Sequence, residues 1–376
     1  MENNLSKKKI LYLGGFELPD KGPAAIRVIN NGRLLRKLGY QVMYVGVQRE
    51  STGVIKASYD GFEYISLSYP KSLKDWFYHL TVFTSSSILD EYNPDIVILY
   101  NFPGYAILKW RYYCKNRGIK VIGDITEWYH PTGSFFTRLL RKADINLRMR
   151  YAHKHLDGLI TISSYLYDYY KGQKRILLPP LFSVRNVCKN IELTDKITLT
   201  FAGGGGINTD RIDYVIKAIQ NSVFDRIEFH VIGLSRQQYE EMYNHHIDSE
   251  IKGVVFHGRL DHQTTIDYLK KSHFQIFIRL INRVTTAGFP SKLAESFSLG
   301  VPVITNKSSN IEDFVHDGEN GFLLERGGVE DVCQLLSKLN RMSQEEYNQI
   351  KQNVINDNSF YVDSYAEAMG AFLNEV

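Results

Sequence analysis

The sequence predicts an α/β protein of two domains, each built on a largely parallel β-sheet. Its 376 residues are more than one typical hydrophobic core holds, and they suit two domains. Short, dense, β-branched apolar runs recur through both halves, as expected of strands buried on both faces. Helix-like segments separate these runs, and this alternation is typical of parallel sheets.

The first half contains six predicted strands. In chain order they are ILYLGG, QVMYVGV, DIVILYN, KVIGDI, GLITIS and RILLPP. A helix is predicted between the first two, in PAAIRVINNGRLLRKLGY. Pro23 stands at its first position, where the missing N–H costs nothing, and Gly39 ends it.

The second half repeats the pattern with ITLTFAGG, IEFHVIG, VVFHG, FQIFIRL, VPVIT and GFLLE. The pattern breaks between the halves in the polar segment FSVRNVCKNIELTDK. We therefore predict domains over residues 1–188 and 189–358. The last segment, FYVDSYAEAMGAFLNEV, predicts an amphipathic helix within 359–376.

Charge distribution, cysteine spacing and hydropathy limit the kinds of protein that this sequence fits. The net charge is +4, yet residues 1–190 hold 28 Lys and Arg against 15 Asp and Glu, so the first half is expected to face something anionic. The cysteines, Cys114, Cys188 and Cys333, are far apart, which argues against a disulfide framework or zinc site. The N-terminal sequence does not resemble a signal peptide, and no apolar run is long enough to span a bilayer. We expect a cytoplasmic protein.

Four consecutive glycines, Gly203, Gly204, Gly205 and Gly206, follow the first predicted strand of the second domain. They would let backbone N–H groups approach a phosphate closely; the alternative is a flexible strand-to-helix turn. Neither a G-x-G-x-x-G dinucleotide fingerprint nor a P-loop Gly-Lys-Ser/Thr is present here.

The segment FIRLINRVTTAGFPSKLAESFSLGVPVI carries three charged residues where ligands usually bind. Arg279 ends a strand-like run, while Lys292 and Glu295 lie in the first turns of the next helix. The unpaired N–H groups of a helix start favour anions, so this helix is predicted to hold a phosphorylated ligand. The alternative is that Glu295 only satisfies the helix dipole and Lys292 is solvated.

The same segment, with VPVITNKSSNIEDFVHDGENGFLL after it and VVFHGRLDHQTTIDYLKKSHFQIFI before it, resembles the nucleotide-sugar-binding signature of the family 4 retaining glycosyltransferases (glycosyltransferases group 1). GGFELPDKGPAAIRVINNGRLLRKLGYQV and LDGLITISSYLYDYY resemble the family's first domain more weakly. The resemblance implies the GT-B fold: two Rossmann-like domains facing across a cleft, with the helix of 359–376 crossing back to the first. It also implies retaining transfer from a nucleotide-sugar to a glycan or lipid-linked acceptor, without metal or cofactor.

The family signature departs from its usual form at three positions. The second Glu of its Glu-x7-Glu motif, which binds the ribose, is matched by Glu295, but the first, which contacts the sugar, falls on Ala287. The Arg and Lys that bind the donor diphosphate are replaced by Gly205 and Asp210. We therefore expect Arg279 and Lys292 to supply the charge. The remaining predicted donor-binding residues are Gly203, Gly204, Gly205, Gly206, Asn208, Pro290 and Ser291.

In the first domain, GDITEWYHP follows a predicted strand and places Asp124, Glu127 and His130 at the ligand-binding end of the sheet. Asp124 and Glu127 are candidate catalytic residues; the alternative is that either one caps a helix or pairs with an arginine. Gly22, Arg27 and His130 are candidate acceptor-side residues. Arg27 lies one turn into its helix, where it either reaches a phosphate or is a surface charge.

The segment SFFTRLLRKADINLRMRYAHKH is strongly basic and has four apolar residues spaced for one side of a helix, Phe135, Phe136, Leu139 and Leu140. It is either a solvated helix whose apolar side is core, or an interfacial helix on an anionic bilayer. The second alternative predicts peripheral association with the inner face of the cell membrane. It suits a polyprenyl-linked acceptor in surface polysaccharide synthesis.

Two other functions fit the same sequence. A non-catalytic GT-B binding subunit would explain Ala287, and a nucleotide-sugar epimerase could share the fold. Nucleic acid is not an expected partner, because no basic stretch is interleaved with aromatic residues. No Asp-x-Asp or His/Cys cluster with metal spacing occurs.

Overall fold

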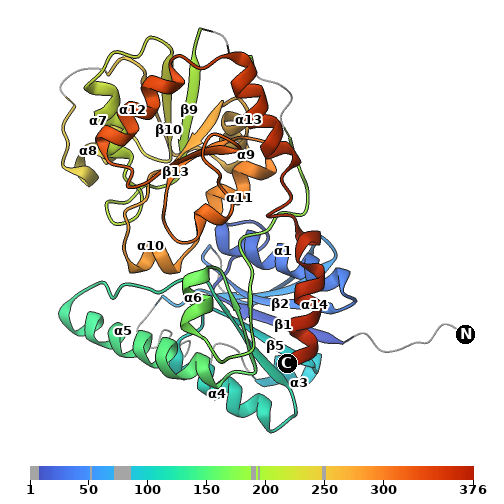
Figure 1. The fold of residues 1–376 in the computed structure, drawn as a ribbon. Helices are drawn as coiled ribbons and strands as arrows, with labels where there is room; N and C mark the ends of the chain where they lie inside the picture. Colours follow the sequence, from blue (N-terminus) through green and yellow to red (C-terminus); the bar gives the residue numbers. More distant parts are fainter. Residues whose placement is uncertain (1–7, 51–52, 72–85, 188–191, 194, 248–250) are drawn as a thin grey trace, which may run out of the picture. The chain divides into compact units, whose positions relative to one another are not determined.

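The structure is a computed structural model that describes residues 8–50, 53–71, 86–187, 192–193, 195–247 and 251–376. It contains two compact units. Unit 1 comprises Met1–Ser183 and Tyr361–Val376, and unit 2 comprises Val184–Phe360. Each unit is a Rossmann-like α/β domain with one sheet, as the sequence predicts (Figure 1). The chain leaves unit 1 a few residues before the predicted boundary at 188 and returns to it close to 359.

The sheet of unit 1 has the strand order β3-β4-β2-β1-β5-β6-β7-β8. The strands are β1 (Lys9–Gly14), β2 (Gln41–Gln48), β3 (Ile55–Tyr59), β4 (Phe62–Ser68), β5 (Ile96–Tyr100), β6 (Lys120–Ile125), β7 (Gly158–Thr161) and β8 (Arg175–Leu177). All neighbours pair in parallel except β3, which is antiparallel to β4. The six predicted strands are confirmed. The hairpin of β3 and β4 was not predicted, because every residue of β3 is exposed and the hairpin lacks a continuous apolar run.

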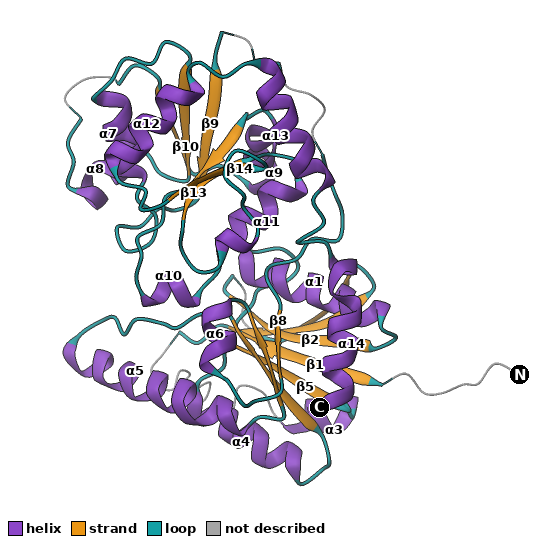
Figure 2. Ribbon diagram, viewed as in Figure 1, coloured by secondary structure: helices purple, strands orange, loops and turns teal. Residues whose placement is uncertain are grey.

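Helices cover both faces of this sheet (Figure 2). They are α1 (Pro23–Lys37), α3 (Ser86–Tyr92), α4 (Gly104–Lys115), α5 (Phe135–Leu147), α6 (Ser164–Tyr169) and α14 (Ala366–Glu375), with the π-helical turn η1 (Arg148–Ala152) and the 3₁₀ turns η2 (His153–His155) and η4 (Val362–Tyr365). One face of the central strands packs against α1 and α14, which lie side by side. Met369 and Phe372 of α14 join Ile10 and Val28 in that core. The last residues of the chain therefore complete the first domain.

The sheet of unit 2 is parallel throughout, with the order β11-β10-β9-β12-β13-β14. Its strands are β9 (Ile197–Ala202), β10 (Ile227–Ile232), β11 (Val254–Gly258), β12 (Phe274–Ile276), β13 (Val303–Asn306) and β14 (Gly321–Leu324). Its helices are α7 (Ile212–Gln220), α8 (Arg236–Tyr243), α9 (His262–Lys270), α10 (Arg283–Ala287), α11 (Ser291–Ser298), α12 (Val329–Leu339) and α13 (Gln344–Asn356), with the 3₁₀ turn η3 (Ile311–Asp313). All six predicted strands are present.

The strand order of unit 2 reverses at β9. The chain continues from β9 to β10 on one side, and later returns to β12 on the other side. In open α/β sheets, ligands bind outside the carboxyl ends of the strands at such a reversal. The segments that follow β9 and β12 are therefore the first place to look for a site in unit 2.

Candidate functional site

The loops after β9 and β12 are joined by backbone hydrogen bonds. The N–H of Arg211 donates to the carbonyl of Ile278 at 2.6 Å, and the N–H of Leu280 donates to Thr209 at 2.8 Å. Asp210 and Arg279 form an antiparallel bridge within this junction. Two segments about 70 residues apart are thus held together at the carboxyl edge of the sheet, with one acidic and one basic side chain between them.

The four-glycine loop has a defined conformation in which part of its backbone is unpaired. Gly205 has a φ of 63°, a conformation that L-residues adopt at a cost. Gly203 donates to the carbonyl of Ile232, and the N–H of Gly206 donates to the Tyr243 hydroxyl. The N–H groups of Gly204 and Gly205 have no hydrogen-bond partner within the part of the chain that the structure describes. Gly204 is also exposed, so these two donors are available to an anion.

Lys292 is neither solvated nor distant from this loop. Its Nζ lies 2.7 Å from Oδ2 of Asp210 and 4.7 Å from the ring centre of Phe201, and its side chain is 20% exposed. A Cβ on Gly203 would lie 2.9 Å from the Lys292 Cε, so the glycine makes room for the lysine to cross the loop. The structure therefore brings a cation directly over the glycine loop, and the interpretation of Lys292 as a solvated surface residue is wrong.

Arg279 is held on the same edge by the side chain of Asn306. The Asn306 Oδ1 accepts from the Arg279 N–H at 2.7 Å, and its Nδ2 donates back to the Arg279 carbonyl at 2.9 Å. The guanidinium donates from Nη1 to the carbonyl of Thr285 at 3.1 Å. Burial lowers the pKa of Arg279 to about 10, and the charge of Asp210 opposes this shift. Arg279 therefore stays charged at neutral pH.

The start of α11 adds further hydrogen-bond donors. Its N-cap is Pro290, which has no side chain able to cap the helix. Among the described residues, the N–H groups of Ser291 and Lys292 have no partner, whereas Leu293 donates to the Pro290 carbonyl at 3.1 Å. Unpaired N–H groups and the helix dipole together favour an anion at this end of α11.

Glu295 lies one turn further along α11. Its carboxylate makes no hydrogen bond or ion pair with any residue that the structure describes. Burial raises its pKa, and the charges of His262 and Lys292 oppose the shift. An acidic group that is largely removed from water and has no hydrogen-bond donor of its own suits the hydroxyl groups of a ligand. Ala287, at the position of the family's other Glu, is completely buried.

The other predicted residue of this edge, Asn208, has an exposed side chain and a fixed backbone. Its carbonyl accepts from Nδ2 of Asn282 at 2.8 Å. Asn282 in turn caps α10 by accepting from Val284 and Thr285. Among the predicted donor-site residues, the glycine loop, Arg279 and Lys292 come together on the one edge. Asp210, which sequence reasoning noted only as a departure from the family, lies between the two cations.

In unit 1, Asp124 and Arg27 are paired in the core. Both are buried, and the Arg27 Nη2 lies 2.8 Å from Oδ1 of Asp124. The Tyr12 hydroxyl donates to Oδ2 of the same carboxylate at 2.5 Å, and Asn31 donates to it at 3.3 Å. Arg27 also donates to the carbonyl of Leu178 at 3.0 Å. The alternative in which Asp124 pairs with an arginine is the one observed, and Arg27 is not a surface charge.

Glu127 and His130 lie on the loop that follows β6. Glu127 is half-buried, and burial raises its pKa, with Arg148 opposing the shift. The Tyr129 hydroxyl is hydrogen-bonded to Glu127, and the Arg148 guanidinium lies 4.7 Å from the Tyr129 ring centre. His130 is exposed, as is Gly22 at the start of α1. Their predicted acceptor-side roles, and the catalytic roles of Asp124 and Glu127, stay predictions.

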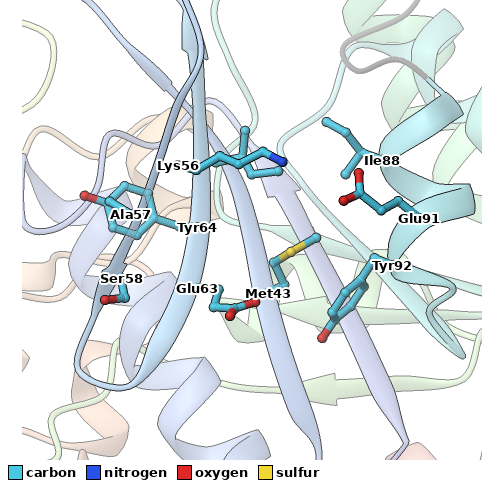
Figure 3. Close-up of a pocket in the computed structure, with 10 residues that line it drawn as sticks. Met43, Lys56, Ala57, Ser58, Glu63, Tyr64, Ile88, Glu91 and Tyr92 are labelled. Atoms are coloured by element: carbon cyan, nitrogen blue, oxygen red, sulfur yellow. The ribbon is translucent and has the colours of Figure 1, made fainter.

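A cavity of about 460 Å³ lies elsewhere in unit 1, between the β3–β4 hairpin and α3 (Figure 3). Its lining includes Met43, Lys56, Glu63 and Tyr92. Met43 pairs with Glu63 near the amino ends of β2 and β4, away from the carboxyl edge. None of the predicted site residues lines this cavity.

Comparison with known proteins supports the assignment of the fold and class. Residues 196–342, most of unit 2, match the family model described as "Glycosyl transferases group 1". Sucrose-phosphate synthase from Thermosynechococcus elongatus is 14% identical, with a TM-score of 0.71 over 98% of this chain and 99% of that one. Anabaena HepE in complex with UDP-glucose is 13% identical, with a TM-score of 0.68 over 98% and 100%.

A third similar structure is the lipopolysaccharide outer core galactosyltransferase WaaB. It is 18% identical, with a TM-score of 0.63 over 97% of this chain and 99% of that one. Comparison with curated protein sequences finds no match. The family match in unit 2 and the GT-B fold of the whole chain together indicate a glycosyltransferase. Within the described residues, no helix has both the length and the hydropathy needed to cross a bilayer.

The buried pair in unit 1 predicts a large loss of stability when one partner is removed. Asp124→Ala leaves the Arg27 guanidinium buried without its counter-charge, so we expect the free energy of unfolding to fall by about 3–5 kcal/mol. Urea denaturation measures this. Asp90→Ala is the control, because it removes an exposed pair with Arg117 at 3.4 Å and should cost less than about 1 kcal/mol. Equal losses in the two variants would contradict a structural role for Asp124.

Proposed function

We propose that the protein transfers a sugar, with retention of configuration, from a nucleotide-sugar to a hydroxyl of a glycan or lipid-linked acceptor in surface polysaccharide synthesis. The observation that carries this is the group of anion-binding elements at one edge of unit 2. The N–H groups of Gly204 and Gly205, the start of α11, Lys292 and Arg279 all lie there, beside the unpaired Glu295. The similar HepE structure is a complex with UDP-glucose, which agrees with a nucleotide-sugar donor.

The chemistry breaks the bond between the anomeric carbon of the sugar and the donor diphosphate. Negative charge develops on the leaving diphosphate as an oxocarbenium-like centre forms on the sugar. Arg279 and Lys292 stabilise that charge by charge-assisted hydrogen bonds, and the N–H groups of the loop and helix add to it. Glu295 accepts hydrogen bonds from the ribose. The acceptor oxygen bonds to the anomeric carbon on the face that the diphosphate leaves, and its proton passes to the leaving diphosphate; no metal or cofactor takes part.

Lys292 replaces the lysine that the family has at position 210. The two positions are far apart in sequence, but the 2.7 Å contact between Lys292 and Asp210 brings them side by side. A lysine on α11 can therefore deliver its charge where a lysine on the glycine loop would. Asp210 neutralises Lys292 until the diphosphate arrives, and the lysine then exchanges one anionic partner for the other.

A non-catalytic binding subunit is the second candidate function, because Ala287 offers no carboxylate to the sugar. Such a subunit would bind the nucleotide-sugar through the same residues without turning it over. Measuring release of the nucleoside diphosphate in the presence of glycan acceptors separates the two functions. An epimerase would instead convert the donor sugar in the absence of any acceptor.

Nucleotide binding is the first test. A nucleotide or nucleotide-sugar present at a hundredfold excess over its Kd should stabilise the fold by roughly 2.7 kcal/mol, which thermal-shift screening detects. Glu295→Ala should weaken that binding, because ribose contacts are made before the reaction begins. Lys271→Ala, an exposed residue at the end of α9, is the control and should bind normally. Wild-type protein that responds to no nucleotide would refute the donor site.

Moving the positive charge from position 292 back to position 210 tests whether Lys292 replaces the family's lysine. Arg279→Ala and Lys292→Leu should each lower kcat by about two to three orders of magnitude, as expected for loss of a group that stabilises transition-state charge. The double variant Asp210→Lys/Lys292→Leu puts the cation back on the loop, and we expect it to recover about tenfold or more relative to Lys292→Leu alone. If the double variant is no more active than the single one, Lys292 does not replace the family's lysine.

We propose that unit 1 binds the inner face of the membrane through α5. No residue of α5 is buried, and its four large apolar residues are 56–76% exposed: Phe135 67%, Phe136 76%, Leu139 56% and Leu140 71%. The alternative in which these side chains form core is therefore wrong. Arg138, Arg141 and Lys142 are exposed on the same helix. Apolar insertion combined with basic residues is the pattern of a helix that lies on an anionic bilayer.

Liposome co-sedimentation tests this membrane contact. The protein should bind phosphatidylglycerol vesicles at low salt, with about 1 kcal/mol from each basic residue near the surface, and should bind neutral vesicles weakly. Phe136→Asp/Leu140→Asp should reduce vesicle binding by about tenfold or more, because it removes two insertion side chains. Val223→Asp, a change at an 85% exposed valine of unit 2, should have no effect. Equal recovery on neutral and anionic vesicles would contradict the proposal.

A further inference from the structure

Arg148 is a buried cation whose hydrogen-bonding groups are not used. It follows the last residue of α5 and begins the π-helical turn η1, and its side chain is 4% exposed. Its Nε and Nη2 have no hydrogen-bond partner among the residues that the structure describes. Of the six Lys and Arg residues from Arg138 to Lys154, Arg148 alone is buried.

The two unpaired nitrogens define the kind of group that fits. Nε and Nη2 form one edge of the guanidinium, and that edge binds two oxygens of a phosphate or carboxylate in parallel. Leaving both N–H groups buried and unpaired costs folding free energy, and a ligand oxyanion would remove that cost. π-Helical turns are rare and occur frequently at functional sites.

The position of Arg148 is fixed by its neighbours. Its backbone N–H donates to the carbonyls of Asp144 and Ile145, and a Cβ on Gly104 would lie 2.8 Å from its nitrogen, so α4 packs closely against this turn. The Tyr129 ring covers one face of the guanidinium. Tyr129 is itself 37% exposed, and the proposal requires the side chains that cover Nε and Nη2 to move for a ligand to enter.

We propose that Arg148 binds the phosphate that joins lipid to glycan in the acceptor. This inference rests on the proposed function and names the acceptor's anionic group. Arg148 continues the helix that carries the exposed apolar residues, and the helical rise places it about 12 Å along the axis from Leu140. The acceptor's phosphate would therefore have to lie beyond the C-terminal end of α5, about 12 Å from the apolar residues, to meet Arg148. Glu127 lies close enough to Arg148 for the arginine's charge to oppose the rise that burial causes in the Glu127 pKa.

The test uses the full chain carrying Arg279→Ala/Lys292→Ala, so that diphosphates do not bind through the donor site. Farnesyl diphosphate, inorganic pyrophosphate and farnesol are titrated by calorimetry. Adding Arg148→Lys keeps the positive charge but removes the pair of parallel N–H donors at Nε and Nη2. We expect this substitution to weaken the binding of farnesyl diphosphate and of pyrophosphate by about tenfold or more, and to leave the binding of farnesol unchanged. Arg150→Lys, an exposed arginine in the same turn, should bind both diphosphates normally.

Three results would overturn the proposal. One is farnesyl diphosphate binding that Arg148→Lys leaves unchanged, and another is no binding by the parent variant. The third is a fall in Tm of more than about 10 °C in both Arg148→Lys and Arg148→Met, which would assign the arginine a structural role. Nucleotide binding separates this inference from the proposed function, since Arg148→Lys should retain the thermal shift with nucleotides. If no nucleotide binds but the Arg148 effect stands, the donor reaction fails while the phosphate subsite remains.

Discussion

The ion pair between Lys292 and Asp210 is the contact on which the arrangement of the unit 2 edge depends. It joins α11 to the end of the glycine loop. The antiparallel backbone β-bridge between Asp210 and Arg279 joins that loop to the segment after β12. Two cations placed side by side without an anion would repel each other and destabilise the fold. Asp210 offsets that repulsion, so the edge keeps both cations in place. The leaving diphosphate is the stronger partner, since it offers more negative charge and more acceptor oxygens.

Two arginines are buried among the described residues of unit 1, and their hydrogen-bonding differs. Arg27 has a full set of partners in Asp124 and the carbonyl of Leu178, and the Tyr12 hydroxyl completes the carboxylate's shell. A closed network of this kind fixes the ends of β1, β6 and β8 relative to one another. Arg148 is equally buried but keeps two N–H groups without a partner among the described residues. Burial alone therefore does not distinguish the two arginines, whereas their hydrogen-bonding does.

Sequence patterns predicted the strands with continuous apolar runs and missed the β3–β4 hairpin, whose residues are largely polar or exposed. They also located Arg279, Lys292 and Glu295, because strand ends and helix starts mark where anions bind. They could not predict the partners of these charges. The contact of Lys292 with Asp210 spans 82 residues, and it depends on how two loops are joined. The burial of Arg148 depends on a π-helical turn and on its packing against α4, and neither has a local signature among basic neighbours.

The charges of the unit 2 edge bear on whether Ala287 marks an inactive protein. Partial burial lowers the pKa of Arg279 to about 10, and the half-buried Glu295 has no hydrogen-bond donor among the described residues. Each costs folding free energy that a ligand would recover, and an apolar residue of similar size would remove the cost altogether. In the proposed mechanism, Ala287 therefore removes one contact to the sugar, and Arg279, Lys292 and Glu295 are the groups proposed to bind the nucleotide.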